Sequence, residues 1–173
     1  TYNRYFIPVF SAVLGLSASR ALGSRFKLDL SYDLGYEVFR EADDADPAFV
    51  VPRDTVNHSL GADIAYTRGG WVAALGGSWT RRQQWAPWGL PGDAAYDPEQ
   101  SDYMQWRAAV ARTWWLGPFK AGLQLEHLDG DDLDRFSAYD FGFFGDSRVA
   151  GYPRGLVRAQ RADGVHLEVA AGL

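Results

Sequence analysis

Polar and apolar residues alternate without interruption from Phe26 to Val38, and this alternation most limits what the chain can fold into. Successive side chains of a β-strand point to opposite faces, so one face of this segment is apolar and the other is polar and charged. The apolar face carries Phe26, Leu28, Leu30, Tyr32, Leu34, Tyr36 and Val38. Strands of soluble sandwiches are usually about 5–6 residues long. A tilted strand that crosses a bilayer needs about 9–11 residues, so the segment predicts a membrane-spanning strand.

The same period of two recurs along the chain and predicts seven antiparallel strands. We expect them at residues 5–19, 26–38, 56–66, 71–80, 104–114, 119–127 and 165–172. The predicted fold class is therefore all-β, an up-and-down transmembrane β-barrel. Single-chain bacterial barrels have an even number of strands, so residues 1–173 are expected to be part of one larger barrel domain.

The predicted connections alternate in length. Tight turns containing glycine are expected at residues 22–24, 68–70 and 116–118. The other connections, near 40–55, 82–101 and 128–163, are long, polar and rich in Asp, Pro and Gly. Short periplasmic turns and long extracellular loops alternate in this way in outer-membrane barrels, so the pattern predicts localisation in the bacterial outer membrane.

The composition argues against one class of binding partner and excludes one class of metal site. The net charge of -5 argues against nucleic acid, whose phosphates need clustered Lys and Arg. The absence of cysteine excludes disulfides and thiolate metal sites. Outer-membrane lipid and lipopolysaccharide are the expected surroundings of a barrel. A soluble β-sandwich that binds glycans through Trp85 and Trp88 stays open as an alternative, because the high aromatic content also suits that fold.

No constellation of residues predicts catalysis, a metal site or a cofactor. The three histidines, His58, His127 and His166, are isolated from one another in the sequence. The acidic run at 129–134 resembles a calcium loop in composition but lacks its bidentate Glu, so we expect a solvated loop there. No nucleophile elbow around a serine occurs. We therefore expect a protein that is not an enzyme.

Charged side chains are predicted to share the face opposite the apolar one. They are Lys27, Asp29, Asp33, Glu37, Asp63, Arg107, Lys120, Glu126 and Glu168. One interpretation is a polar barrel wall wetted by water. Another is a set of acceptors for a loop that carries arginine, held by charge-assisted hydrogen bonds.

The segment 141–155 mixes glycines, aromatic residues and arginines and lies just before the last predicted strand. It resembles the sixth-loop motif of the BamA/TamA superfamily of outer-membrane assembly and secretion barrels, a Gly-rich motif of the form Val-Arg-Gly-Tyr/Phe. The matching positions are Gly145, Val149, Gly151 and Tyr152, whereas Ala150 stands at the position of the motif arginine. One expectation is that Arg148 or Arg154 replaces that arginine, with Glu168 on the next strand as the acceptor. The alternative is that the docking interaction is lost.

This resemblance implies a fold and a function. It implies that the segment supplies strands seven to thirteen of a sixteen-stranded barrel, and that the loop reaches into the lumen and docks on the inner wall. It also implies insertion or export of unfolded protein clients at the outer membrane, without cofactor or covalent chemistry. A porin-like channel or scaffold barrel, in which the same loop projects outward, stays as the alternative.

Overall fold

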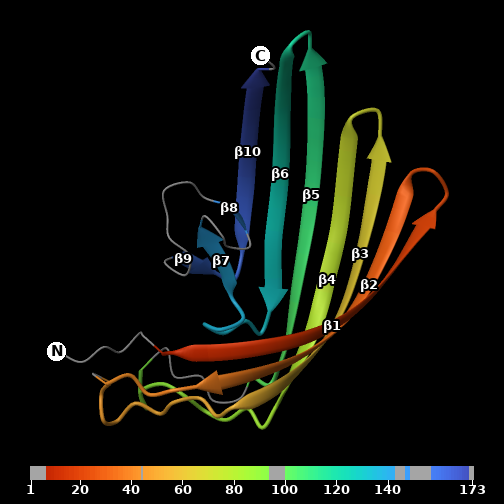
Figure 1. The fold of residues 1–173 in the computed structure, drawn as a ribbon. Coiled ribbons are helices and arrows are strands. Elements are labelled where there is room, and N and C mark those ends of the chain that lie inside the picture. The colour runs from red at the N-terminus through yellow and green to blue at the C-terminus, as the bar shows by residue number, and fades with distance from the viewer. Residues whose placement is uncertain (1–6, 44, 94–99, 143–146, 149–156, 172–173) are drawn as a thin grey trace.

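The computed structural model describes residues 7–43, 45–93, 100–142, 147–148 and 157–171. Its main element is one sheet of seven antiparallel strands, in the order β1-β2-β3-β4-β5-β6-β10 (Figure 1). The strands are β1 (Val9–Leu22), β2 (Phe26–Phe39), β3 (Thr55–Arg68), β4 (Trp71–Gln83), β5 (Asp102–Leu116), β6 (Phe119–Asp131) and β10 (Ala162–Ala171). The prediction of an all-β, antiparallel, up-and-down arrangement of seven strands is confirmed. The sheet is curved but does not close into a barrel.

Most strands extend further than the alternation predicts. Strand β6 continues to Asp131, beyond the predicted end at residue 127, and β5 begins at Asp102. Met104 and Asp131 are partners in the ladder that joins these two strands. The polar run after His127 has the composition of a loop, yet backbone pairing with β5 keeps it extended. At the other edge, the described part of β1 begins at Val9 instead of residue 5.

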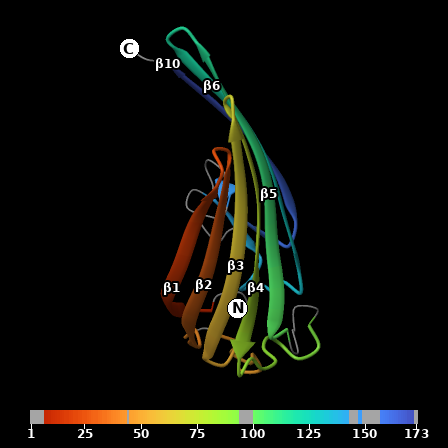
Figure 2. The same cartoon turned by 90° about the vertical axis from the view of Figure 1, so that its right-hand side faces the viewer.

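The connections lie at two different ends of the sheet (Figures 1 and 2). The tight turns β1–β2, β3–β4 and β5–β6 lie at one end, the turn end, where Gly23, Gly69, Gly70 and Gly117 adopt positive φ. Glycine suits these positions because it has no Cβ to clash in the left-handed region. The long connections lie at the opposite end, the loop end, as the sequence predicts.

A second, small sheet lies on the concave side of the large one (Figure 1). It consists of β7 (Tyr139–Gly142), β8 (Ser147–Arg148) and β9 (Val157–Ala159), in the order β8-β7-β9. The sequence predicts only a loop here. The three strands are two to four residues long, too short for a period of two to be detected.

The register of the large sheet assigns the two faces. Leu30 lies opposite Ala18 on β1 and Ala62 on β3, so these three side chains share a face. The connection between β6 and β10 lies on the concave side of the sheet, and the polar face makes the contacts to it. The polar face is therefore concave and the apolar face convex. Large apolar side chains are therefore exposed over the outside of the sheet.

The buried hydrophobic residues are few and gather at the loop end. Among the described residues they are Phe39, Trp88, Leu128, Leu133 and Tyr139. Leu128, Leu133 and Tyr139 form one cluster, with Tyr103 and Phe141 packed against it. The core of this structure thus holds the connecting segments against the concave face.

No helix in the described ranges is long and apolar enough to cross a membrane.

Candidate functional site

The concave face carries the charged side chains that the alternation assigns to it. Asp29 lies opposite Asp63, Glu37 opposite Thr55, and Asp33 opposite Ser59 on neighbouring strands. Glu168 lies opposite Gly122, and Arg107 lies opposite Leu128. All nine predicted charged residues are in phase with one another, so the predicted face is confirmed.

Among the described residues, several exposed lysine and arginine side chains of this face form ion pairs. Lys27 Nζ is 2.8 Å from Asp29 Oδ1, Arg107 Nη2 is 3.0 Å from Asp63 Oδ1, and Lys120 Nζ is 2.9 Å from Glu168 Oε1. The Arg107 and Asp63 side chains are 66% and 40% exposed, so water screens their attraction. Such exposed pairs contribute about 0–1 kcal/mol each to stability. The concave face is therefore a charged surface in contact with water, and these ion pairs add little to the stability of the fold.

Gly76 permits the pair that spans three strands. It lies between Asp63 on β3 and Arg107 on β5 in the same row of the sheet. A methyl group at Gly76 would overlap the Asp63 carboxylate. The absence of a side chain here therefore lets the Asp63 carboxylate lie across β4 to meet Arg107.

A buried ion pair joins the sheet to the connection after β6. Arg82, on the concave face of β4, donates from Nη1 to Asp134 Oδ2 at 2.5 Å and from Nη2 to Asp134 Oδ1 at 3.1 Å. The two side chains are 2% and 1% exposed. This two-bond geometry between guanidinium and carboxylate is the most directional form of ion pair. We call it the loop anchor.

Asp134 also organises the chain around it. Its Oδ1 accepts hydrogen bonds from the backbone N–H groups of Phe136 and Ser137, at 2.8 Å and 2.9 Å, and from the Ser137 hydroxyl at 2.9 Å. Side-chain acceptors of this kind stabilise a turn locally. The same carboxylate therefore forms the turn and ties it to β4.

Aromatic rings enclose the anchor. The Arg82 guanidinium lies 4.2 Å from the centre of the Trp85 ring and 4.7 Å from that of Tyr103. Phe136 packs at 4.9 Å from Trp88 and 5.0 Å from Phe39, measured between ring centres. These rings exclude water from the charges, which strengthens their attraction and raises the cost of leaving either charge alone.

Further contacts hold the same connection against the concave face. Gln105 Nε2 donates to the Ser137 carbonyl oxygen at 2.8 Å. The Tyr139 hydroxyl lies 2.8 Å from the carbonyl oxygens of Trp106 and Asp129. A cavity of about 240 Å³ lies beside Tyr139, and Asp63, Arg107 and Gln105 line it. The first part of the connection thus covers the polar face instead of extending away from it.

The expectation of a solvated acidic run at 129–134 is wrong at Asp134, which is 6% exposed. The residue lies 52 positions from Arg82 in the sequence, so no local pattern connects the two. Two signals were nevertheless present. Arg82 is in phase with the concave set, and Asp134 precedes Ser137 by three residues, the spacing of a side-chain-closed turn.

The predicted loop-docking residues fall largely outside the described part of the chain. Gly145, Val149, Gly151, Tyr152 and Arg154 lie there, as does Ala150, and of Arg148 only the backbone is described, in β8. Glu168 lies on the concave face and pairs with Lys120, which is on the neighbouring strand β6. Its role as acceptor for an arginine of the loop stays a prediction.

In the described residues, no group of three or more His, Asp or Glu side chains is arranged to hold a metal ion. Comparison of the sequence with models of protein families, with curated proteins and with solved structures finds no match.

Proposed function

We propose that this chain forms part of the wall of a transmembrane β-barrel in the bacterial outer membrane. Its convex face contacts lipid, its concave face lines a water-filled lumen, and the part of the β6–β10 connection nearest to β6 folds inward and narrows that lumen. The observation that carries the proposal is the distribution of apolar side chains. Among the described residues, 28 large hydrophobic side chains are exposed and five are buried.

The degree of exposure argues against a soluble sheet with one wet face. Leu14, Leu167 and Val169 are 68%, 79% and 80% exposed, although they are among the most apolar residues of their strands. Burying such a side chain stabilises a protein by about 1.5–3 kcal/mol. A soluble fold would cover this face, whereas lipid covers it in a barrel, with apolar-out and polar-in alternation.

Strand length supports the same proposal. The seven strands of the large sheet have 10 to 15 residues. About 9–11 residues suffice for a tilted strand to cross the hydrocarbon core, so each strand is long enough.

The activity that we propose is insertion or export of proteins, as in the BamA/TamA barrels that the 141–155 segment resembles. A loop held inside the lumen is the feature that such an assignment requires. The loop anchor and the contacts of Gln105 and Tyr139 support an inward fold for the part of the connection nearest to β6.

A porin-like channel is the second candidate. The cavity beside Tyr139 favours it, because Asp63 and Arg107 present opposite charges to a space of about 240 Å³ between the sheet and the loop. Opposed charges at the narrowest part of a lumen select among polar solutes.

Single cysteines test the membrane embedding. In the full-length protein, reconstituted in vesicles, Leu30→Cys and Leu123→Cys should react slowly with a water-soluble maleimide and contact lipid-attached quenchers. Ser31→Cys and Gln124→Cys, one residue along the same strands, should show the reverse. Equal reactivity at both sets would overturn the proposal.

Depletion in the native host separates the two activities. If the protein inserts others, its loss should lower the folded fraction of other outer-membrane barrels. A channel should leave that fraction unchanged and should conduct ions steadily in planar bilayers.

A further inference from the structure

The convex face is hollowed at one place. A shallow groove of about 910 Å³ runs over β2 to β5, and nearly all of its lining is apolar. Its floor consists of the small residues Ala62 and Gly77, which lie opposite each other on β3 and β4. Large side chains flank it, namely Leu30, Leu60, Leu75, Trp79, Met104 and Trp106. A shallow apolar groove flanked by bulky side chains can accept a hydrocarbon chain.

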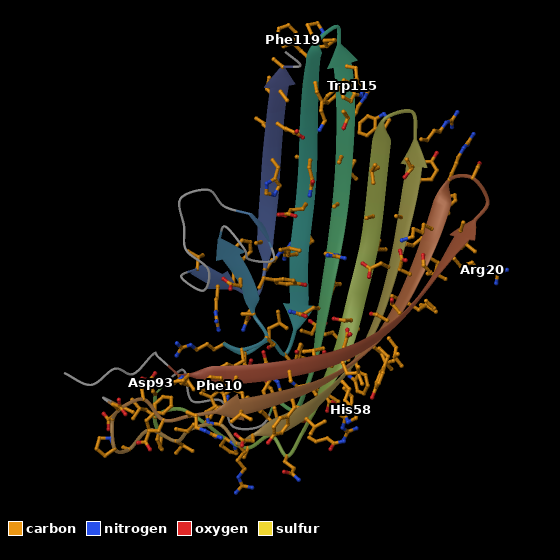
Figure 3. The ribbon with its side chains drawn as sticks, in the orientation of Figure 1. Phe10, Arg20, His58, Asp93, Trp115 and Phe119 are labelled. Carbon is orange, nitrogen blue, oxygen red and sulfur yellow. The ribbon has the colours of Figure 1, made fainter. Side chains whose placement is uncertain are left out.

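A polar cluster follows the groove toward the loop end, on the same face. Along β3 the order is Ala62, Leu60, His58, and along the paired β4 it is Gly77, Trp79, Arg81. Arg81 is four residues from Gly77, which corresponds to about 13 Å along an extended strand. His58 lies on the convex side of the sheet (Figure 3). The apolar groove thus ends at the side chains of Arg81, His58 and Tyr32.

Hydrogen bonds hold His58 in place from both sides. Its Nδ1 lies 2.8 Å from the Tyr32 hydroxyl and its Nε2 lies 2.8 Å from Gln83 Nε2. When Gln83 donates to Nε2, the ring proton is on Nδ1 and is donated to the Tyr32 oxygen. The hydroxyl hydrogen of Tyr32 is then available to an acceptor outside the cluster.

Arg81 supplies the charge. Its side chain is 62% exposed, and it forms a long ion pair with Asp102, whose Oδ1 is 3.9 Å from Nε. That distance is too long for a hydrogen bond. The guanidinium therefore keeps donors for an anion, and planar guanidinium groups match phosphate oxygens well.

We propose that the groove and this cluster together bind one lipid of the loop-side leaflet, a phosphate-bearing acylated glycolipid. One acyl chain lies over Ala62 and Gly77, and the phosphate accepts hydrogen bonds from Arg81 and Tyr32. His58 positions Tyr32 through the hydrogen bond between its Nδ1 and the Tyr32 hydroxyl. This inference rests on the proposed function, since it requires that the convex face lies in a bilayer.

Lipid retention in nanodiscs tests the site. The full-length protein is placed in nanodiscs of phosphatidylcholine containing lipopolysaccharide or enzymatically dephosphorylated lipopolysaccharide, and retained glycolipid is counted by native mass spectrometry after delipidation. Wild type should retain the phosphorylated form. Arg81→Gln should reduce retention about tenfold, the loss expected for one charge-assisted hydrogen bond. Ala62→Trp fills the groove and should reduce retention of both forms.

Matched variants act as controls. Arg112→Gln removes the same charge from the same face nearer the turn end, where Arg112 stacks on Trp71 and Trp114, and should leave retention unchanged. Ala121→Trp enlarges the same face away from the groove and should also have no effect. Equal losses for Arg81→Gln and Arg112→Gln, or none for either, would overturn the lipid site.

The cysteine experiment on Leu30 and Ser31 distinguishes failure of the lipid site from failure of the proposed barrel. Normal insertion with no specific retention rejects the lipid site alone. A convex face that reacts as if it were in water rejects the barrel, and the lipid site with it.

Discussion

The Arg82–Asp134 pair shows how much a single buried residue can contribute to the stability of the fold when its partner is distant in the sequence. Water is excluded from both charges, so each depends on the other and on the hydrogen bonds around it. Removing one partner of a buried pair commonly costs about 3–5 kcal/mol, because an uncompensated charge is left behind. The exposed pairs of the concave face have no comparable effect.

A double-mutant cycle at the loop anchor measures the contribution of the Arg82–Asp134 pair to the free energy of unfolding. Asp134→Asn should lower the free energy of unfolding by about 3–5 kcal/mol, and Arg82→Met by a similar amount. The double variant should lose less than the sum, since neither charge is then left alone. Urea unfolding of the full-length protein in vesicles, followed by tryptophan fluorescence, measures each value.

The exposed pair of Lys120 with Glu168 is the matched control. Lys120→Met should change stability by about 0–1 kcal/mol, because both side chains are in contact with water. Equal costs for Lys120→Met and Asp134→Asn would contradict a water-free anchor.

At the scale of strands, the sequence predicts faces better than ends. A period of two reports which face a residue occupies, and the register confirms the predicted phase on all seven strands. Strand ends were missed where polar residues continue a ladder, as at 128–131 on β6. Backbone pairing does not require an apolar side chain, so composition does not mark where it stops.

The candidate site was predictable in part for the same reason. The concave charges follow from phase alone. The loop anchor depends on how a connection folds back in three dimensions, and Asp134 looks like any other aspartate of its acidic run. The small sheet β7–β9 was missed because two to four residues carry too little pattern.

Neighbouring positions of β6 test the assigned faces. Leu123→Arg should lower stability in vesicles by about 2–4 kcal/mol if this residue faces the middle of the bilayer. Gln124→Arg, on the concave face, should change it by about 0.5 kcal/mol or less. The measurement is urea unfolding of the full-length protein. A larger cost at Gln124 than at Leu123 would reverse the assignment of the faces.

At the scale of the whole molecule, the loop decides how open the proposed lumen is. The described part of the connection is held by the anchor, by Gln105 and by Tyr139. Releasing it should widen the passage without changing the wall. Permeation therefore reports on the loop, whereas the free energy of unfolding reports on the wall and on the loop anchor together.

Conductance in planar bilayers should rise for Asp134→Asn relative to wild type, with larger and more frequent openings. Asp163→Asn removes a carboxylate that pairs with His127 at the convex surface and is 80% exposed, and it should leave conductance unchanged. Unaltered conductance in Asp134→Asn, with normal insertion, would show that the loop does not narrow the passage.

The two edges of the large sheet are different surfaces. In the described residues, β1 pairs only with β2 and β10 only with β6, so a full row of backbone groups is exposed on each outer side. Neither strand has the inward lysine or proline that discourages pairing between edges. When β1 of one copy meets β10 of another, the contact is head-to-tail and each copy still has an open edge. Expressed alone without lipid, these strands should therefore grow into rings or fibres and not stop at a dimer.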